Sequence, residues 1–229
     1  MAVSVALENG RVTTIADVLP LLGLRVSAGP IELRGITDDD LVTLAALAAG
    51  GVHAPERMPF TFPWTDTAPE EFALKFAQYH WRTRADFRPE AWDLNLGVWV
   101  DGELVGVQGL GTTKYLVTRS GETGSWLGQA HQGRGVGTAM RQVMCAFCFD
   151  HLDAVQITSG AFTDNPASLA VSRKVGYREN GMVRRERRPG EVATTVELLL
   201  APEDLVRGEH PLEVHGLEAF RRSIGLDSD

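Results

Sequence analysis

The sequence predicts a mixed α/β (α+β) fold, in which a mostly antiparallel central sheet contains one parallel pair and is flanked by helices. Alternating apolar residues around the turn signal Asp101-Gly102 indicate antiparallel hairpins in the first half of the chain. A strand–helix–strand unit follows over residues 123–162. Because a crossover that contains a helix joins parallel strands, this unit predicts the parallel pair.

Length and composition are those of one globular domain with short flanking segments. The 229 residues are 44% hydrophobic and 23% charged, which is ordinary for such a domain. A net charge of −8 argues against nucleic acid and anionic membranes as partners. We place the domain at residues 29–200, with an N-terminal extension at 1–28 and a C-terminal tail at 201–229. Both flanking segments are candidates for a homodimer contact.

Neither a membrane span nor a disulfide framework is expected. No apolar run is long enough to cross a bilayer. The two cysteines, Cys145 and Cys148, suggest no disulfide framework, so we expect a cytoplasmic protein. No second cysteine pair and no histidine at zinc-finger spacing accompany them. We therefore expect them to pack in the core, and we expect no metal site.

The N-terminal half is predicted to hold one strand, two helices and a hairpin. Thr37 and Asp40 form a capping-box pattern at the start of the first helix, which Gly50 ends. Thr67-Ala68-Pro69-Glu70 resembles a second capped start, after a structured loop rich in proline and aromatic residues. The predicted segments are strand 31–34, loop 53–66, helix 70–81 and hairpin strands 94–100 and 104–110.

The C-terminal half changes to a helical period and then returns to strands. Apolar residues at 136, 139, 140, 143, 144 and 147 mark an amphipathic helix. Asn165-Pro166 opens another helix that Gly176 ends, and Pro189-Gly190 turns a final hairpin. The predicted strands are one that ends at Trp126-Leu127, one over 155–162, and hairpin strands 177–187 and 192–200.

A glycine-rich loop joins the strand that ends at Leu127 to the amphipathic helix. Its glycines allow a tight turn that brings N–H groups close to a ligand, and the helix adds unpaired N–H groups and a positive dipole end. This combination binds phosphate or pyrophosphate, and we favour it over a plain turn. The loop has neither the Gly-Lys-Ser/Thr of a P-loop nor the G-x-G-x-x-G of a Rossmann loop. Its sequence is Gln132-Gly133-Arg134-Gly135-Val136-Gly137-Thr138.

Three motifs in this order resemble one family. Gln132-x-x-Gly135-x-Gly137 resembles the Q/R-x-x-G-x-G/A signature of the GNAT superfamily of N-acetyltransferases. Gly124-Ser125-Trp126-Leu127, separated from Gly133 by five residues, is similar to the Rim-type branch, which includes ribosomal-protein N-terminal acetyltransferases. The resemblance covers about residues 31–200. The remaining motifs that resemble this branch are Ile31-Glu32-Leu33-Arg34 followed by Asp38-Asp39-Asp40-Leu41, Asn165-Pro166-Ala167-Ser168-Leu169, and Lys174-Val175-Gly176-Tyr177, which resembles a Lys-x-Gly-Phe ending.

The resemblance implies a GNAT domain that binds acyl-CoA in a cleft between two splayed parallel strands. The main chain at Trp126 and Leu127 would pair with the pantetheine arm, and Asn165 and Ser168 would face its thiol end. Asn165 is equally explained as a helix N-cap alone. The residues that would hold the pyrophosphate are Gln132, Gly133, Arg134, Gly135, Val136, Gly137 and Thr138.

Two side chains are candidates for proton transfer. Glu122 could take a proton from the incoming ammonium, directly or through water, or it is an exposed strand charge. Ser172 stands where many GNAT enzymes have a tyrosine that protonates the leaving thiolate. A serine is a poor acid, and we favour a structural role for it. His80 and His131 are weaker candidates for the base.

The resulting hypothesis is direct transfer of an acetyl group, or of a succinyl or other acyl group, from CoA to a primary amine. The acceptor is a protein N-terminus, a lysine or a small molecule, in a site shaped by loop 58–64 and helix 70–81. Two alternatives stay open: a non-catalytic acyl-CoA-binding or sensing module, and a binder of another nucleotide phosphate. We interpret the basic run at 184–188 as a solvated face, in preference to a contact for an acidic acceptor or acyl group.

Overall fold

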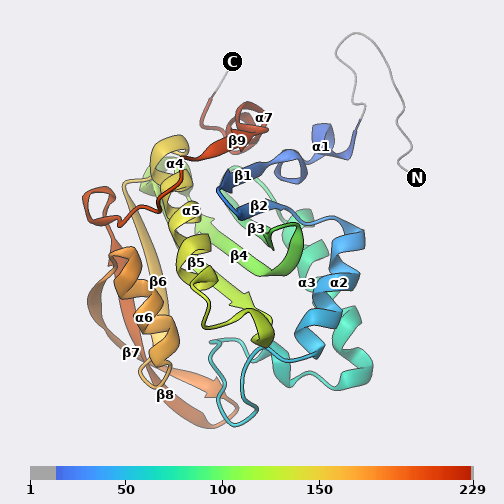
Figure 1. Cartoon of the computed structure of the whole chain (residues 1–229), viewed down its shortest axis with the longest axis vertical. Coiled ribbons are helices and arrows are strands. Elements are labelled where there is room, and N and C mark those ends of the chain that lie inside the picture. Colours follow the sequence, from blue (N-terminus) through green and yellow to red (C-terminus); the bar gives the residue numbers. More distant parts are fainter. Residues whose placement is uncertain (1–13, 228–229) are drawn as a thin grey trace.

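In the computed structural model, which describes residues 14–227, a nine-stranded sheet forms the centre of the molecule (Figure 1). The strand order is β7-β8-β6-β5-β4-β3-β2-β1-β9, and only β5 and β6 are parallel. The predicted sheet is therefore confirmed. The strands are β1 Arg25–Ala28, β2 Ile31–Gly35, β3 Ala91–Val100, β4 Glu103–Thr113, β5 Ser120–Leu127, β6 Gln156–Phe162, β7 Arg178–Arg188, β8 Glu191–Leu200 and β9 Glu213–His215.

Helices cover both faces of this sheet. α2 and α3 pack together on one face, against β4 and β3, whereas α5 and α6 pack together on the other (Figure 1). The α-helices are α1 Ile15–Val18, α2 Asp38–Ala49, α3 Pro69–Ala85, α4 Tyr115–Thr118, α5 Val136–His151, α6 Pro166–Val175 and α7 Leu217–Ser223.

Local sequence signals placed most of these elements correctly. The Thr37 N–H donates to the Asp40 carboxylate over 2.8 Å and the Asp40 N–H donates to the Thr37 hydroxyl over 3.2 Å, so the capping box forms. Asp101 and Gly102 both have positive φ, 50° and 84°, as the predicted hairpin turn requires.

The start of α3 differs from the prediction. Its N-cap is Ala68, which offers no side-chain bond, and the Thr67 hydroxyl donates instead to the Trp64 carbonyl over 3.0 Å. Pro69 at the first helical position has no N–H to satisfy and has its φ already fixed, so the helix begins without a cap. α3 also continues to Ala85, four residues beyond the predicted end.

Parts of both flanking segments join the sheet. β1 pairs with β2, and β9 from the C-terminal tail pairs with β1, with Arg25 opposite His215. Phe220 of α7 is fully buried and lies edge-on to Trp92 at 5.9 Å between ring centroids. The tail therefore packs on the domain. Residues 1–13 of the predicted N-terminal extension lie outside the described residues.

Apolar clusters lie on both faces of the sheet. The larger one lies under α5 and includes Phe147, Leu94 and both cysteines, which are free and buried, so their core packing is confirmed. The smaller one lies under α2 and α3 and includes Phe72. Over residues 14–227, no cluster of histidine, cysteine and acidic side chains is arranged to hold a metal ion, and no helix is long and apolar enough to cross a membrane.

Gly176→Ala is expected to destabilise the protein more than Gly190→Ala does. Both glycines have positive φ, 108° and 78°, so either alanine costs about 1–2 kcal/mol of backbone strain. A methyl group at Gly176 would also overlap the Asp204 main-chain carbonyl, whereas one at Gly190 meets no atom within 4 Å. Urea unfolding measures both free energies, and equal losses would contradict the close approach at Gly176.

Candidate active site

β5 and β6 are paired at one end only and then separate. The parallel register ends with Glu122 opposite Thr158, although both strands continue beyond it. At this point the Thr123 hydroxyl donates to the Thr158 carbonyl over 3.3 Å, and the Ser159 hydroxyl donates to the Thr123 carbonyl over 3.2 Å. Because side chains replace the ladder there, no strand of residues 14–227 pairs with the later part of β5 on its β6 side.

The glycine loop follows β5 and leads into α5. Gly133 and Gly135 have φ of 72° and 86°, and a methyl group added at either would meet no atom within 4 Å. Within the described part of the chain, no acceptor pairs with the N–H groups of residues 133–137, whereas the Thr138 N–H bonds to the Gly135 carbonyl over 3.0 Å. The loop therefore presents a row of unpaired N–H groups to open space at the start of a helix, which suits a phosphate.

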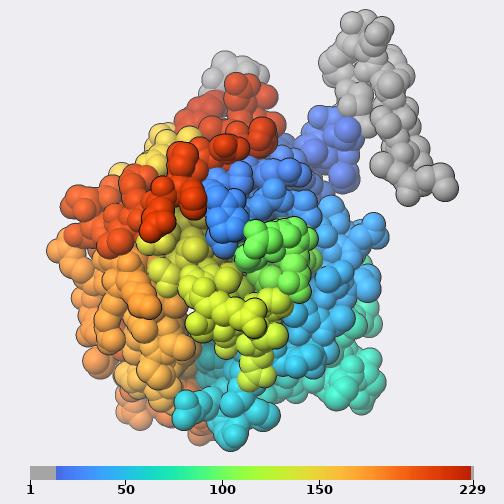
Figure 2. All heavy atoms as spheres, viewed as in Figure 1, coloured from blue at the N-terminus to red at the C-terminus, as the bar shows by residue number. Residues whose placement is uncertain are grey.

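Gln132 and Arg134 of the loop differ in their contacts. Gln132 fixes the loop, because its amide donates to the carbonyls of Val52 and Leu127 over 2.7 and 2.9 Å. Arg134 is exposed, and its guanidinium is of the type that donates bidentate hydrogen bonds to phosphate. Figure 2 shows the yellow-green atoms of this region at the surface, between the orange of α6 and the blue of α2.

The predicted residues of α6 lie in one hydrogen-bonded chain. Asn165 accepts the Ser168 N–H over 3.2 Å, so its predicted N-cap is confirmed. The Ser172 hydroxyl donates to the Ser168 carbonyl over 3.0 Å and accepts from Arg141 over 2.9 Å. Ser172 is fully buried, and its hydroxyl both donates and accepts a hydrogen bond.

A cavity of about 1310 Å³ lies on the α3 face of the sheet. Its floor comes from β3, β4 and β5, and it reaches Glu122, Ser125 and Thr158, where β5 and β6 separate. Loop 58–64 and helix 70–81, which the sequence analysis assigned to the acceptor site, supply much of its wall. The aromatic residues that line it are Phe60, Phe62, Trp64, Phe72, Phe76, Tyr79, Trp92 and Trp126.

Three carboxylates line this cavity, those of Asp86, Asp93 and Glu122. Burial within the cavity walls raises the pKa of Glu122, and Glu197 raises it further, while Arg185 partly opposes the shift. Burial, followed by Asp86, likewise raises the pKa of Asp93 on β3. Asp93 was not predicted from the sequence as a site residue. Its place beside Leu94 in an alternating strand would have put it on the face opposite the main core.

The two histidines are less suited than Glu122 to the role of the base. His80 is buried on α3, and burial together with Arg84 lowers its pKa to about 4, so it is neutral near pH 7 and binds a proton poorly. His131 lies beside the loop, 3.7 Å from the Glu103 carboxylate. Of the three base candidates, Glu122 is the carboxylate, and it lines the cavity.

Comparison with known proteins decides the family. Residues 31–178, more than half of the chain, match the family model described as acetyltransferase (GNAT) domain. This chain belongs to the GNAT acetyltransferase family. The Bacillus subtilis protein named "Putative ribosomal N-acetyltransferase YdaF" is 30% identical over 102 residues, which are 43% of this chain and 55% of that protein. The chain thus spans about half the length of that relative.

Solved structures confirm the GNAT fold. Mycobacterium smegmatis RimJ, in complex with CoA-disulfide, has a TM-score of 0.69 at 24% identity, over 81% of this chain and 88% of that one. RimL, a ribosomal L7/L12 alpha-N-protein acetyltransferase in complex with coenzyme A, has a TM-score of 0.63 at 17% identity, over 76% and 95%.

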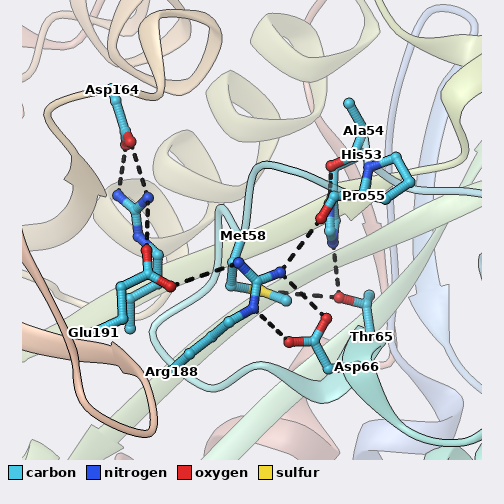
Figure 3. Close-up of polar contacts among 10 residues, drawn as sticks. His53, Ala54, Pro55, Met58, Thr65, Asp66, Asp164, Arg188 and Glu191 are labelled. Atoms are coloured by element: carbon cyan, nitrogen blue, oxygen red, sulfur yellow. Dashed lines mark hydrogen bonds and ion pairs between the residues drawn. The ribbon is translucent and has the colours of Figure 1, made fainter.

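In this GNAT domain, the β7–β8 hairpin fastens the aromatic loop that lines the cavity. Arg188 donates to Asp66 over 2.7 and 3.3 Å and to the Pro55 carbonyl over 3.4 Å (Figure 3). Arg187 donates to Asp164 over 2.6 and 2.9 Å. Much of the predicted basic run is therefore paired with carboxylates of the same chain instead of forming a free cationic face.

Arg188→Gln is expected to loosen residues 53–66 without unfolding the GNAT domain. The Arg188 bond lowers the pKa of Asp66, so the pair persists at neutral pH and is lost only as pH falls through that depressed pKa. Both side chains are partly exposed, so amide exchange in the loop should rise only about two- to fivefold. Lys75→Gln, which breaks the exposed pair with Glu71, is the control. Unchanged exchange in Arg188→Gln would show that the loop is held by its other contacts.

Proposed function

We propose that this chain transfers an acetyl group from acetyl-CoA to a primary amine. The observation that carries the proposal is the meeting of two features where β5 and β6 separate. The unpaired N–H groups of residues 133–137 lie at the end of β5, and the cavity that holds Glu122 reaches the start of the separation. A CoA held on the loop can extend its pantetheine along the unpartnered edge of β5, and its thioester then meets an amine in the cavity.

The proposed transfer balances without a covalent enzyme intermediate. The amine nitrogen attacks the thioester carbonyl carbon, a C–N bond forms, the C–S bond breaks, and CoA leaves as a thiolate. A main-chain N–H near Leu127 polarises the carbonyl. Glu122 takes the proton that the ammonium must lose, directly or through water. Its raised pKa brings the carboxylate closer to the range in which a base works at neutral pH.

The remaining candidate residues have roles at the pantetheine. The main chain of Trp126 and Leu127 pairs with the arm, although the Leu127 carbonyl already accepts from Gln132. Asn165 uses only its side-chain oxygen for the cap, which leaves its NH₂ group for the thiol end together with Ser168.

We propose a protein N-terminus as the acceptor. A cavity of about 1310 Å³ with aromatic walls can hold the first residues of a peptide chain. The names of YdaF and RimL, which both specify ribosomal acetyltransferases, support this class. A lysine or a small amine is the competing outcome of an amine panel. A cytoplasmic location agrees with two free, buried cysteines, and sedimentation would decide between a monomer and a homodimer.

A non-catalytic acyl-CoA-binding or sensing module is the second candidate. The observation in its favour is that the Ser172 proton is donated to the Ser168 carbonyl, which leaves a departing thiolate without that acid. Such a module would bind CoA thioesters and turn over no amine.

Thermal unfolding with CoA, acetyl-CoA, succinyl-CoA, ATP and NAD tests the ligand, and an acetylation assay with peptides, lysine and polyamines tests the reaction. A true ligand at about 100 times its dissociation constant stabilises by about 2.7 kcal/mol. Shifts with CoA species alone, followed by turnover, support the proposal. A shift only with ATP or NAD would overturn it, and binding without turnover would favour the second candidate.

Gly135→Ala is expected to weaken CoA binding at least about tenfold, the effect of disturbing one hydrogen bond to a charged group. Gly102→Ala is the matched control, because Gly102 has nearly the same φ, 84° against 86°, and an added methyl group meets no atom within 4 Å at either position. Both variants should lose similar stability, and only Gly135→Ala should lose affinity in calorimetry. Equal CoA affinity in both would remove the loop from the binding site.

Glu122→Gln is expected to lower kcat by about 10²- to 10⁴-fold, as for a lost general base, with CoA affinity unchanged. Wild-type activity should fall as pH drops through the raised pKa of Glu122. A raised carboxyl pKa means that ionised Glu122 is less favourable in the folded than in the unfolded protein, so the uncharged glutamine should not lower stability at pH 7. Glu179→Gln, at an exposed strand position, is the control. A wild-type kcat in Glu122→Gln would rule out this base.

A further inference from the structure

Arg141 on α5 is a buried cation without a carboxylate partner among the described residues. Its side chain donates to the Ser172 hydroxyl over 2.9 Å and to the Ser125 hydroxyl over 3.1 Å, and its buried Nε has no hydrogen-bond partner there. Its residue exposure is 6%. Arg187, exposed to 8%, instead has a bidentate bond to Asp164. The two most buried arginines therefore differ in whether their charge is neutralised.

A buried charge with only neutral partners is costly. Removing an ion from water is unfavourable unless an opposite charge offsets it, and a hydroxyl supplies a dipole but no charge. The titratable groups that interact with Arg141 are Cys145 and Tyr177. Burial raises the pKa of Cys145 to about 11, and it raises that of Tyr177 well above its usual value, so both are neutral near pH 7. The guanidinium charge is thus left available to an anion from outside the chain.

The guanidinium lies where the proposed reaction ends. Ser125 belongs to the part of β5 beyond its last pairing with β6, and it also lines the cavity. Ser172 belongs to α6, so Arg141 bridges β5 and α6 beside the separated strands. The Ser172 hydroxyl donates its proton to the Ser168 carbonyl. This place therefore offers a positive charge, while the Ser172 proton is already engaged.

We propose that Arg141 stabilises the CoA thiolate as an anion when the C–S bond breaks, in place of a general acid. The proposal rests on the acetyl transfer proposed above. The C–S electron pair stays on sulfur, Arg141 keeps its protons, and the proton of the amine goes toward Glu122. The thiolate takes a proton from water after it leaves. A fixed cation that meets charge only as it develops lowers the barrier without reorganisation.

Titration of bound CoA tests this charge without any turnover. The ultraviolet absorbance of the thiolate is followed against pH for CoA bound to the wild type and to Arg141→Gln, with desulfo-CoA complexes as blanks for the protein's own groups. At a given pH below the thiol pKa, the wild type should hold about tenfold more CoA thiolate than Arg141→Gln does, the effect of a pKa lower by about one unit. Equal titrations in two folded, CoA-saturated proteins would overturn the proposal.

Kinetics test the same charge during transfer. Arg141→Gln should lower kcat with acetyl-CoA by about 10²- to 10³-fold, with the KM for acetyl-CoA changed less than about threefold. The loss should shrink for a thioester with a more acidic thiol, which needs less stabilisation. Arg173→Gln, an exposed arginine on α6, is the control. A loss that is the same for both thioesters would make Arg141 structural and overturn the proposal.

The remaining outcomes are also decisive. If Arg141→Gln does not fold, Arg141→Lys, which keeps the charge, and Ser125→Ala, which removes one of its supports, take its place. Both should retain more thiolate than free CoA does, and a titration equal to that of free CoA would overturn the proposal. If the wild type binds CoA but acetylates no amine, the proposed function fails, while the titration still decides the role of Arg141. A preference for succinyl-CoA that disappears in Arg141→Gln would assign the cation to an acyl carboxylate and overturn the thiolate role.

Discussion

The functional region depends on how two parallel strands separate without leaving buried polar groups unpaired. A ladder that simply stopped at Glu122 and Thr158 would strand main-chain carbonyls inside the sheet. The hydroxyls of Thr123 and Ser159 each donate to a carbonyl of the opposite strand, so the next groups stay paired while the strands diverge. The later edge of β5 thereby becomes available to a ligand, and the cavity on the α3 face reaches the same place.

The same point is supported from the far side of the sheet. The Thr123 hydroxyl lies 2.9 Å from the Tyr177 hydroxyl, which lies 3.3 Å from the Cys145 sulfur on α5. Tyr177 follows Gly176, whose positive φ and close approach to Asp204 set the chain direction after α6. This buried polar column ties α5, the end of α6 and β5 together. Through Tyr177, the motif at residues 174–177 therefore supports the point where the strands separate, although it lies far along the chain from the glycine loop.

Prediction from the sequence succeeded for features whose cause is local. The capping box of Thr37 and Asp40, the turn at Asp101-Gly102 and the glycine loop each depend on a few adjacent residues, and each was found. It failed where partners are distant in the chain. The pairing of β9 with β1 joins residues about 190 positions apart, and no local pattern specifies it.

The site shows the same division. The loop 132–138 was predicted because three glycines and a helix start suffice to recognise it, whereas the contacts around it had no signal. The bond from Arg188 to Asp66 spans 122 positions, and the contacts of Arg141 span 16 and 31. An arginine in an amphipathic helix is ordinarily assigned to the solvent face. Only the tertiary structure shows that Arg141 points inward, toward the separated strands.

The protein and its proposed substrate are both negatively charged, and the distance over which each charge acts explains how they can still bind. A net charge of −8 repels an anion such as CoA, but interactions between exposed charges are largely screened beyond about 8–10 Å at physiological salt. In the proposed complex, the unpaired N–H groups of residues 133–137 and the guanidinium of Arg134 contact CoA at hydrogen-bond distance, where their attraction exceeds the screened repulsion of the distant charges. The buried charge of Arg141 is screened least of all, because little water reaches it. An acidic protein can therefore bind an acyl-CoA through a few groups placed in contact with it. The cost of burying the unneutralised charge of Arg141 is consistent with a site where negative charge develops during the reaction.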